Sequence, residues 1–262
     1  MQRPPVNEVV WSVAVERTPA LIGPYLPDVL GPWFAELAEV QPVFPYEMPV
    51  EHVDLRQGYA GRQNPIMELL PIPDAARYWL TSPGQPWLVQ VQNDYLALNW
   101  RAGHSSEPYV GFDAMRLRFE SLLGQVHVGL ERRGADLRPL RAEMTYINII
   151  EPNSLWEHVN DLHRLLAVEV PDSQGTERLS LAYSKGLQVQ EAWAGRVHVT
   201  LDTGYDPVKD APRVALTITA RSGSLSSSTT EGSLGFLNAA HAHIEQTFLG
   251  LLTPSARKEW DL

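Results

Sequence analysis

Residues 86–101 read PWLVQVQNDYLALNWR, and the way this stretch pairs with itself follows from the residues alone. Asn93-Asp94 is a good two-residue hairpin turn, since both residues tolerate a left-handed backbone and hydrogen-bond locally. A turn there places three apolar pairs on one face of the ribbon. The pairs are Val91 with Leu96, Val89 with Leu98 and Trp87 with Trp100. The other face is polar and carries Gln90, Gln92, Tyr95, Asn99 and Arg101.

The composition limits the class of protein. The chain has 262 residues, 44% of them hydrophobic, which is enough for one large or two small domains. Its formal net charge of −10 argues against a nucleic-acid partner, which needs a basic surface. The chain has no cysteine, which excludes disulfides, zinc-thiolate sites and thiol nucleophiles. Without a signal peptide or a run of about 18 apolar residues, we expect a cytoplasmic protein and no membrane partner.

The first half of the sequence predicts a strand, a broken helix, further strands and a long helix. Glu8–Glu16 alternates as a strand does, and prolines should interrupt the helix that follows it. Residues 39–74 form a proline-rich, mostly irregular connection with at most one short strand. Arg77–Leu80 is a strand that leads into the hairpin. Apolar residues at helical spacing then predict a helix that begins near Phe112.

The second half predicts a similar order. Leu140–Glu151 is a strand, and Ser154 with Glu157 reads as the capping box of a helix. The last helix has an apolar stripe over residues 234–251. Four strand candidates lie between these helices: Arg178–Ser184, Leu187–Trp193, Arg196–Thr203 and Arg213–Arg221.

Both halves therefore follow the order β-α-β(n)-α, which predicts an α+β fold of antiparallel sheets with helices packed on one face. The residue identities do not repeat, so we interpret this as an internal duplication of the layout, with halves at 1–136 and 137–262. The sheet face away from the helices should be polar. In the second half that face would carry Arg196, His198, Thr200, Thr217 and Thr219.

Several motifs are spread over nearly the whole chain. They are Pro4-Pro5-Val6-x-Glu8-Val9-Val10, Val89-Gln90-Val91-Gln92, Asn99-Trp100-Arg101 with Tyr109, Tyr146-Ile147-Asn148, Leu201-Asp202, and a final helix with His241, Phe248 and Thr253. Together they resemble a sporadically distributed family of uncharacterised prokaryotic proteins. That family carries no established activity. Its patchy distribution implies an accessory role, of the kind found in defence-type gene sets.

The best candidate site in the first half is a polar patch of Gln90, Asn99 and Arg101, with Tyr109 close by. Arginine binds carboxylates and phosphates with two parallel hydrogen bonds, and the amides of Asn and Gln match amide-like edges. The competing interpretation is structural. In it, Arg101 pairs with Glu107 and Asn99 holds the adjoining loop.

Four more residues extend this candidate site. His104 and Glu107 lie on the adjoining loop and could form an acid/base pair. Tyr146 and Asn148 share one face of their strand, and they would join the patch if that strand lies beside the hairpin.

Other motifs are better explained without chemistry. Asp202-Thr203-Gly204 matches the core of aspartic proteases, but a strand ending in a turn explains it more simply. His241 lies on the apolar stripe of the last helix and is expected to be a hydrogen-bonded core histidine. Neither a metal-ligand spacing nor a phosphate loop or dinucleotide motif occurs, so we predict no cofactor and no metal.

These patterns favour a non-catalytic binding or assembly protein that holds a protein partner or a small ligand on an open sheet face. The reason is that the sequence contains no standard catalytic constellation. The alternative is a hydrolytic enzyme that uses His104 with Glu107, or His198 with Asp202, as acid and base. A third possibility is a homodimer in which sheet edges pair.

Overall fold

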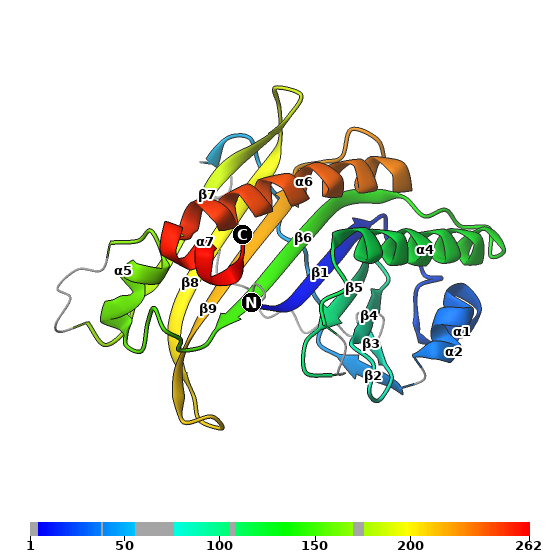
Figure 1. The fold of residues 1–262 in the computed structure, drawn as a ribbon. Coiled ribbons are helices and arrows are strands. Elements are labelled where there is room, and N and C mark those ends of the chain that lie inside the picture. The colour runs from blue at the N-terminus through cyan, green and yellow to red at the C-terminus, as the bar shows by residue number, and fades with distance from the viewer. Residues whose placement is uncertain (1–4, 38, 56–75, 105–107, 170–175) are drawn as a thin grey trace, which may run out of the picture.

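The structure, a computed structural model, describes residues 5–37, 39–55, 76–104, 108–169 and 176–262 (Figure 1). The strands are β1 (Val6–Val15), β2 (Glu39–Val43), β3 (Arg77–Thr81), β4 (Trp87–Gln92), β5 (Tyr95–Arg101), β6 (Pro139–Ile150), β7 (Ser180–Val189), β8 (Ala192–Asp206) and β9 (Ala211–Ser222). They form one nine-stranded antiparallel sheet in the order β2-β3-β4-β5-β1-β6-β9-β8-β7.

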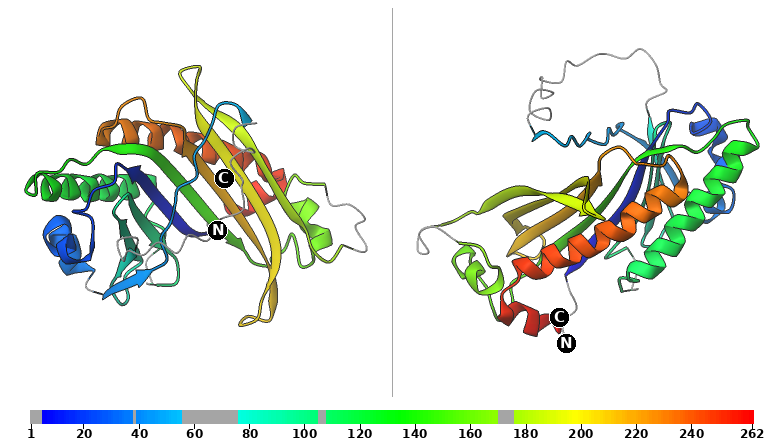
Figure 2. Two further views of the ribbon diagram at one scale, coloured as in Figure 1. Left: turned by 180° about the vertical axis from the view of Figure 1, so that it is seen from behind. Right: turned by 90° about the horizontal axis from the view of Figure 1, so that it is seen from above.

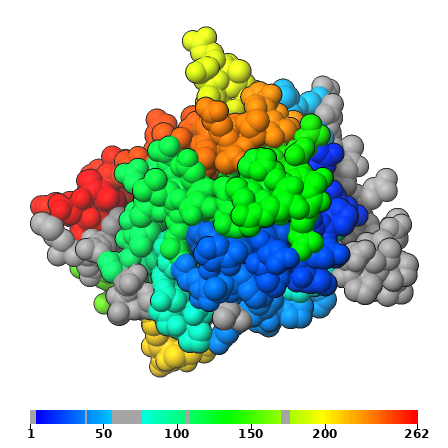
Figure 3. Space-filling view, turned by 90° about the vertical axis from the view of Figure 1, so that its right-hand side faces the viewer, coloured from blue at the N-terminus to red at the C-terminus, as the bar shows by residue number. Residues whose placement is uncertain are grey.

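The two long helices lie on one face of this sheet, which we call the helix face (Figure 2). The helices are α1 (Leu26–Leu30), α2 (Pro32–Glu36), α4 (Phe112–Glu131), α5 (Leu162–Leu165), α6 (Thr230–Leu251) and α7 (Pro254–Trp260). Figure 3 shows α4, in green, between α6 in orange and the α1–α2 segment in blue. The fold is therefore α+β, as predicted. The β1–β6 pairing joins strands from both halves in one sheet, while the internal duplication and the division at residue 137 stay predictions.

The predicted hairpin register is confirmed. β4 and β5 pair Trp87 with Trp100, Val89 with Leu98 and Val91 with Leu96. These side chains are buried on the helix face, beside Trp11 of β1. Trp11 is fully buried and packs edge-on against Phe119 of α4, with ring centroids 5.9 Å apart. The apolar face of the hairpin thus forms part of the main core.

The opposite face of the sheet is crossed by residues 44–55, which we call the strap (Figure 2, left). At one end of the strap, Tyr46 N donates to Gln92 Oε1 at 2.9 Å, and Gln92 Nε2 donates to Tyr46 O at 3.1 Å. Toward the other end, the Arg196 guanidinium donates to His52 O at 2.5 Å and to Val53 O at 3.2 Å. This strap-side face is therefore partly covered, where the sequence suggested that it is open.

The predicted helix start at Ser154 is wrong. The Asp161 side chain accepts hydrogen bonds from Glu157 N at 3.3 Å and from His158 N at 3.2 Å. This bonding caps a short 3-10 turn, and the α-helix begins only at Leu162. Side chains that bond locally to the backbone compete with an earlier helix start.

Other boundaries also differ from the prediction. The two short strands expected between residues 178 and 193 are one strand, β7, because the turn falls at Gln190 and Glu191. Both residues have positive φ (50° and 66°), a conformation that glutamine and glutamate seldom adopt. The sequence therefore does not indicate a turn at these positions. α6 ends at Leu251, but Thr253 then caps a further helix, α7, by accepting from Ala256 N at 3.2 Å.

Candidate functional site

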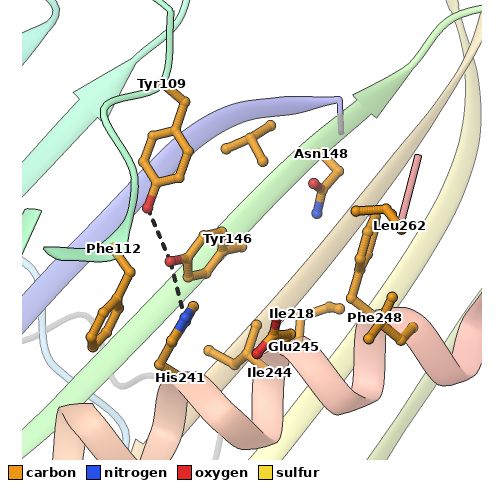
Figure 4. A pocket seen from close by; sticks show the side chains of 12 residues that line it. Tyr109, Phe112, Tyr146, Asn148, Ile218, His241, Ile244, Glu245, Phe248 and Leu262 are labelled. Carbon is orange, nitrogen blue, oxygen red and sulfur yellow. Dashed lines mark hydrogen bonds between the residues drawn. The ribbon is translucent and has the colours of Figure 1, made fainter. Parts of the chain in front are cut away.

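A pocket of about 510 Å³ opens on the helix face, between α6 and the sheet (Figure 4). Its lining is mostly apolar. Val6 comes from β1, Tyr146 and Asn148 from β6, Ile218 from β9, and Ile244 and Phe248 from α6. This volume and this kind of lining are typical of small-molecule sites.

The strand register places the polar residues of β6 in this pocket. Tyr146 pairs with Val9 of β1 and with Ile218 of β9, so its side chain points toward the helices. Asn148 lies two residues further on and therefore points to the same face. The pocket therefore lies at the part of the helix face where β6 carries these two polar side chains next to apolar core residues.

Four pocket residues of α6 share one face of the helix. His241, Ile244, Glu245 and Phe248 are spaced i, i+3, i+4 and i+7, which aligns their side chains. Two of these four are polar in an otherwise apolar stripe. The helix thus brings one imidazole and one carboxylate to the sheet residues.

A chain of hydrogen bonds runs along one wall of the pocket. The hydroxyls of Tyr109 and Tyr146 are 3.0 Å apart, and the Tyr146 hydroxyl is 3.5 Å from His241 Nδ1 (Figure 4). The His241 ring stacks on Phe112 with centroids 3.9 Å apart, which fixes its plane. Each hydroxyl has only one hydrogen to donate. If Tyr146 donates its hydrogen to His241, then the bond between the two hydroxyls must be donated by Tyr109.

Burial keeps these three side chains uncharged. It raises the pKa of the Tyr109 hydroxyl, and the neighbouring Tyr146 raises that pKa further. Burial also raises the pKa of Tyr146 to about 12, although the bond from Tyr109 opposes this. The pKa of His241 is lowered by burial, against the attraction of Glu245 and Asp113. Near neutral pH this wall therefore offers hydrogen bonds but no charge.

Asn148 supplies a second polar position in the pocket. Its side chain is only 3% exposed, and Nδ2 donates to Leu216 O at 3.2 Å. This bond orients the amide and leaves its oxygen and its second N–H hydrogen for a ligand. A buried amide held in this way is suited to fixing the orientation of a ligand.

The structure divides the predicted site residues between the two faces of the sheet. Tyr109, Tyr146 and Asn148 meet at the pocket on the helix face. Gln90 and Asn99 lie on the strap-side face, because they alternate with the apolar residues of the hairpin. β1 also separates β6 from the hairpin. The expectation that Tyr146 and Asn148 could join the hairpin patch is therefore corrected.

The hairpin amides bond within the chain. Gln90 Oε1 accepts from Arg77 Nη1 at 2.9 Å and from Trp79 Nε1 at 3.2 Å. Gln90 Nε2 donates to Asn99 Oδ1 at 2.8 Å, and Asn99 Nδ2 donates to Glu8 Oε1 at 2.6 Å. These bonds link β3, β4, β5 and β1. They support the structural interpretation of Gln90 and Asn99.

The structure describes two of the three remaining predicted residues of this region, Arg101 and His104. Arg101 is half-buried, and burial lowers its pKa, against the attraction of Glu8. His104 is exposed. Glu107 lies outside the residues that the structure describes, so its pairing with either side chain stays a prediction.

The second acid/base pair considered from the sequence is also divided. His198 Nε2 lies 2.6 Å from Glu51 Oε1 of the strap. Asp202, four residues further along β8, accepts from Ser180 Oγ at 2.5 Å. The two side chains thus have separate partners, and the hydrolytic mechanism gains no geometric support from them.

Sequence reasoning missed the contribution of α6 to the site. It interpreted His241 as a core histidine hydrogen-bonded to a neighbour, with Glu245 one helical turn away, and assigned neither residue to a binding site. The signal available was the stripe itself, in which two polar residues interrupt an apolar face. Across the described residues, no group of three or more His, Cys, Asp or Glu side chains could hold a metal ion. No helix in the described part of the chain is long and apolar enough to cross a membrane.

No family model, curated protein or solved structure matches the chain. The family resemblance therefore stays an expectation from the sequence.

Proposed function

We propose that this protein binds a small, largely apolar ligand in the pocket between α6 and β6, without catalysing a reaction. The observation that carries the proposal is the combination of an apolar cavity of about 510 Å³ with a few oriented, uncharged polar groups. Apolar walls supply affinity, and a few fixed hydrogen-bonding groups set orientation.

The protonation states favour binding over catalysis. A general acid or base works best when its pKa lies near the working pH. The Tyr146 hydroxyl, with a pKa raised to about 12, keeps its proton, and so does Tyr109. His241 faces this phenol on its Nδ1 side. The two hydroxyls are thus suited to hydrogen-bond a ligand and poorly suited to exchange protons with it.

The proposal keeps the binding function expected from the sequence and changes its location. The expected surface was the open sheet face around Gln90 and Asn99, whose amides bond to other residues of the chain. The hydrolytic alternative, the protein partner, the homodimer and the accessory role stay predictions.

A neutral fluorescent dye, N-phenyl-1-naphthylamine, tests this proposal, because its emission rises when it enters an apolar site. The variant Leu249→Trp places a large side chain in the pocket, since Leu249 lines it and is half-buried. The matched control is Leu117→Trp, because Leu117 on α4 is 67% exposed. We expect the wild type and the control to bind the dye. The pocket variant should bind it at least about tenfold more weakly, or about 1.4 kcal/mol.

Two results would contradict the proposal. One is a wild-type protein that does not bind the dye. The other is equal binding by both tryptophan variants, provided that their melting temperatures show them to be folded.

A further inference from the structure

We infer that the ligand of this pocket is an amphiphilic amine, with a positively charged nitrogen on an apolar or aromatic body. The inference rests on the proposed function, because it names the ligand class for the same pocket. It is carried by the charge and the ring chemistry of the lining residues.

The charge of the pocket has one sign. Glu245 is the one acidic side chain among the described lining residues, and these include neither lysine nor arginine. His241, one helical turn earlier, is kept neutral by burial. A bound anion would therefore meet a carboxylate with no described cation in the lining to offset it. An ammonium group would meet an opposite charge.

Glu245 lies at the solvent-accessible edge of the pocket. Its side chain is exposed, while Ile244 and Ile218 beside it are buried (Figure 4). A ligand nitrogen at this edge can approach the carboxylate and keep part of its own hydration, which limits the cost of desolvation. The apolar body would then lie against the isoleucines.

Aromatic rings add a second preference for a cation. Phe112, Tyr146 and Phe248 all line the pocket, together with Tyr109. Phe248 is held by stacking on Trp260, with ring centroids 6.1 Å apart and planes within 10°. The faces of such rings attract cations and repel anions. A ring that presents its face to the cavity acts in the same direction as Glu245.

The polar groups deeper in the pocket carry no positive charge that would oppose this ligand. The oxygen of Asn148 can accept a hydrogen bond, as can an uncharged Tyr hydroxyl. The net charge of −10 over the whole chain also favours the approach of a cation over that of an anion.

Displacement of N-phenyl-1-naphthylamine by three compounds with one shared body tests the inference. They are 4-phenylbutylamine, 4-phenylbutan-1-ol and 5-phenylpentanoate, which differ in the charge of the terminal group. We expect the amine to displace the dye at a concentration about five- to tenfold lower than the alcohol, in line with an exposed ion pair and ring contacts. The carboxylate should be the weakest competitor.

Charge variants of the protein identify the residue responsible. Glu245→Gln should reduce the preference for the amine to the part that the ring contacts supply, and it should leave the affinity for the alcohol unchanged. Glu231→Gln removes the same charge from the first turn of the same helix, where the side chain is exposed and outside the pocket. This control should keep the preference for the amine.

The outcomes separate the two proposals. If the dye binds in the pocket but the alcohol or the carboxylate competes as well as the amine, the ligand class is overturned and the pocket remains. The same holds if Glu245→Gln keeps the full preference for the amine. If the wild type does not bind the dye, the proposed function itself fails.

Discussion

The two faces of the sheet are covered in different ways. On the helix face, α4 and α6 bury large apolar side chains such as Trp11 and Phe119, and the packing leaves a pocket at one end. On the strap-side face, an irregular segment is held by charged hydrogen bonds between Glu51, Arg196 and Arg221. Apolar burial is non-directional and can leave space, whereas charged bonds fix where a segment lies.

The charged network on the strap side is compact and buried. Glu51 Oε2 accepts from Arg196 at 3.2 Å, and Oε1 accepts from Arg221 at 3.1 Å. Arg221 Nε also donates to Glu143 at 2.5 Å. Burial alone would raise the pKa of Glu51, but His198 and the two arginines outweigh it and lower that pKa to about 2. The strap is thus held by buried charged groups that share several partners, and the loss of one leaves a buried charge with fewer of them.

The largest expected effect is on the helix face. Trp11→Ala removes a fully buried ring that contacts Phe112 at 5.3 Å and Phe119 at 5.9 Å between centroids. We expect the free energy of unfolding to fall by about 3 to 5 kcal/mol, measured by urea denaturation. A loss below about 1 kcal/mol would show that apolar burial does not dominate on this face.

On the strap side, Arg196→Ala should lower the free energy of unfolding by about 3 kcal/mol, because Glu51 loses a partner in a buried position. Dye binding in the pocket, on the other face, should be unchanged. The control Arg138→Ala removes a pair with Glu16 in which both side chains are more than half exposed. It should cost less than about 1 kcal/mol. Equal losses in the two variants would contradict the difference drawn between buried and exposed pairs.

Acid should weaken the strap side in particular. The pKa of Glu51 is about 2 in the folded protein, below its ordinary value of 4.5, so its ionised form stabilises the fold above pH 4.5. This contribution, up to about 3 kcal/mol, is lost as the pH falls from 4.5 toward 2. Urea denaturation from pH 6 to pH 2.5 should show a shallower acid decline for Glu51→Gln than for the wild type. Parallel curves would count against this role.

The smallest effect is expected in the pocket wall. Tyr146→Phe removes the hydroxyl between Tyr109 and His241 and should cost about 1 kcal/mol. If Tyr146 donates to Nδ1, the loss of that donor disfavours the neutral ring, and the pKa of His241 should rise. An NMR titration of the ring protons measures this change. The control is Tyr183→Phe on the exposed edge strand β7, which should leave the titration unchanged.

The sequence predicts the features that depend on residues close together in the chain. The hairpin register followed from Asn93-Asp94 and alternating side chains, and the helix from Phe112 followed from its apolar spacing. The strap could not be predicted, because it depends on contacts such as Glu51 with Arg196, which are 145 residues apart. Non-local pairs of this kind leave no periodic signal.

Of the candidate site, too, only the features that depend on a local pattern could be predicted. Tyr146 and Asn148 were correctly placed on one face of their strand. Which face it is depends on β1 lying between β6 and the hairpin, an order that the sequence does not contain. The contribution of His241 and Glu245 required the packing of α6 on the sheet.

The most direct test of the pocket is a ¹H–¹⁵N NMR titration of the protein with N-phenyl-1-naphthylamine. We expect shift changes concentrated at the pocket, around Tyr146, Asn148 and His241, with the amides of Gln90 and Asn99 unaffected. Changes centred on the strap-side face around Gln90 and Asn99, with the pocket amides unmoved, would contradict the binding site proposed on the helix face.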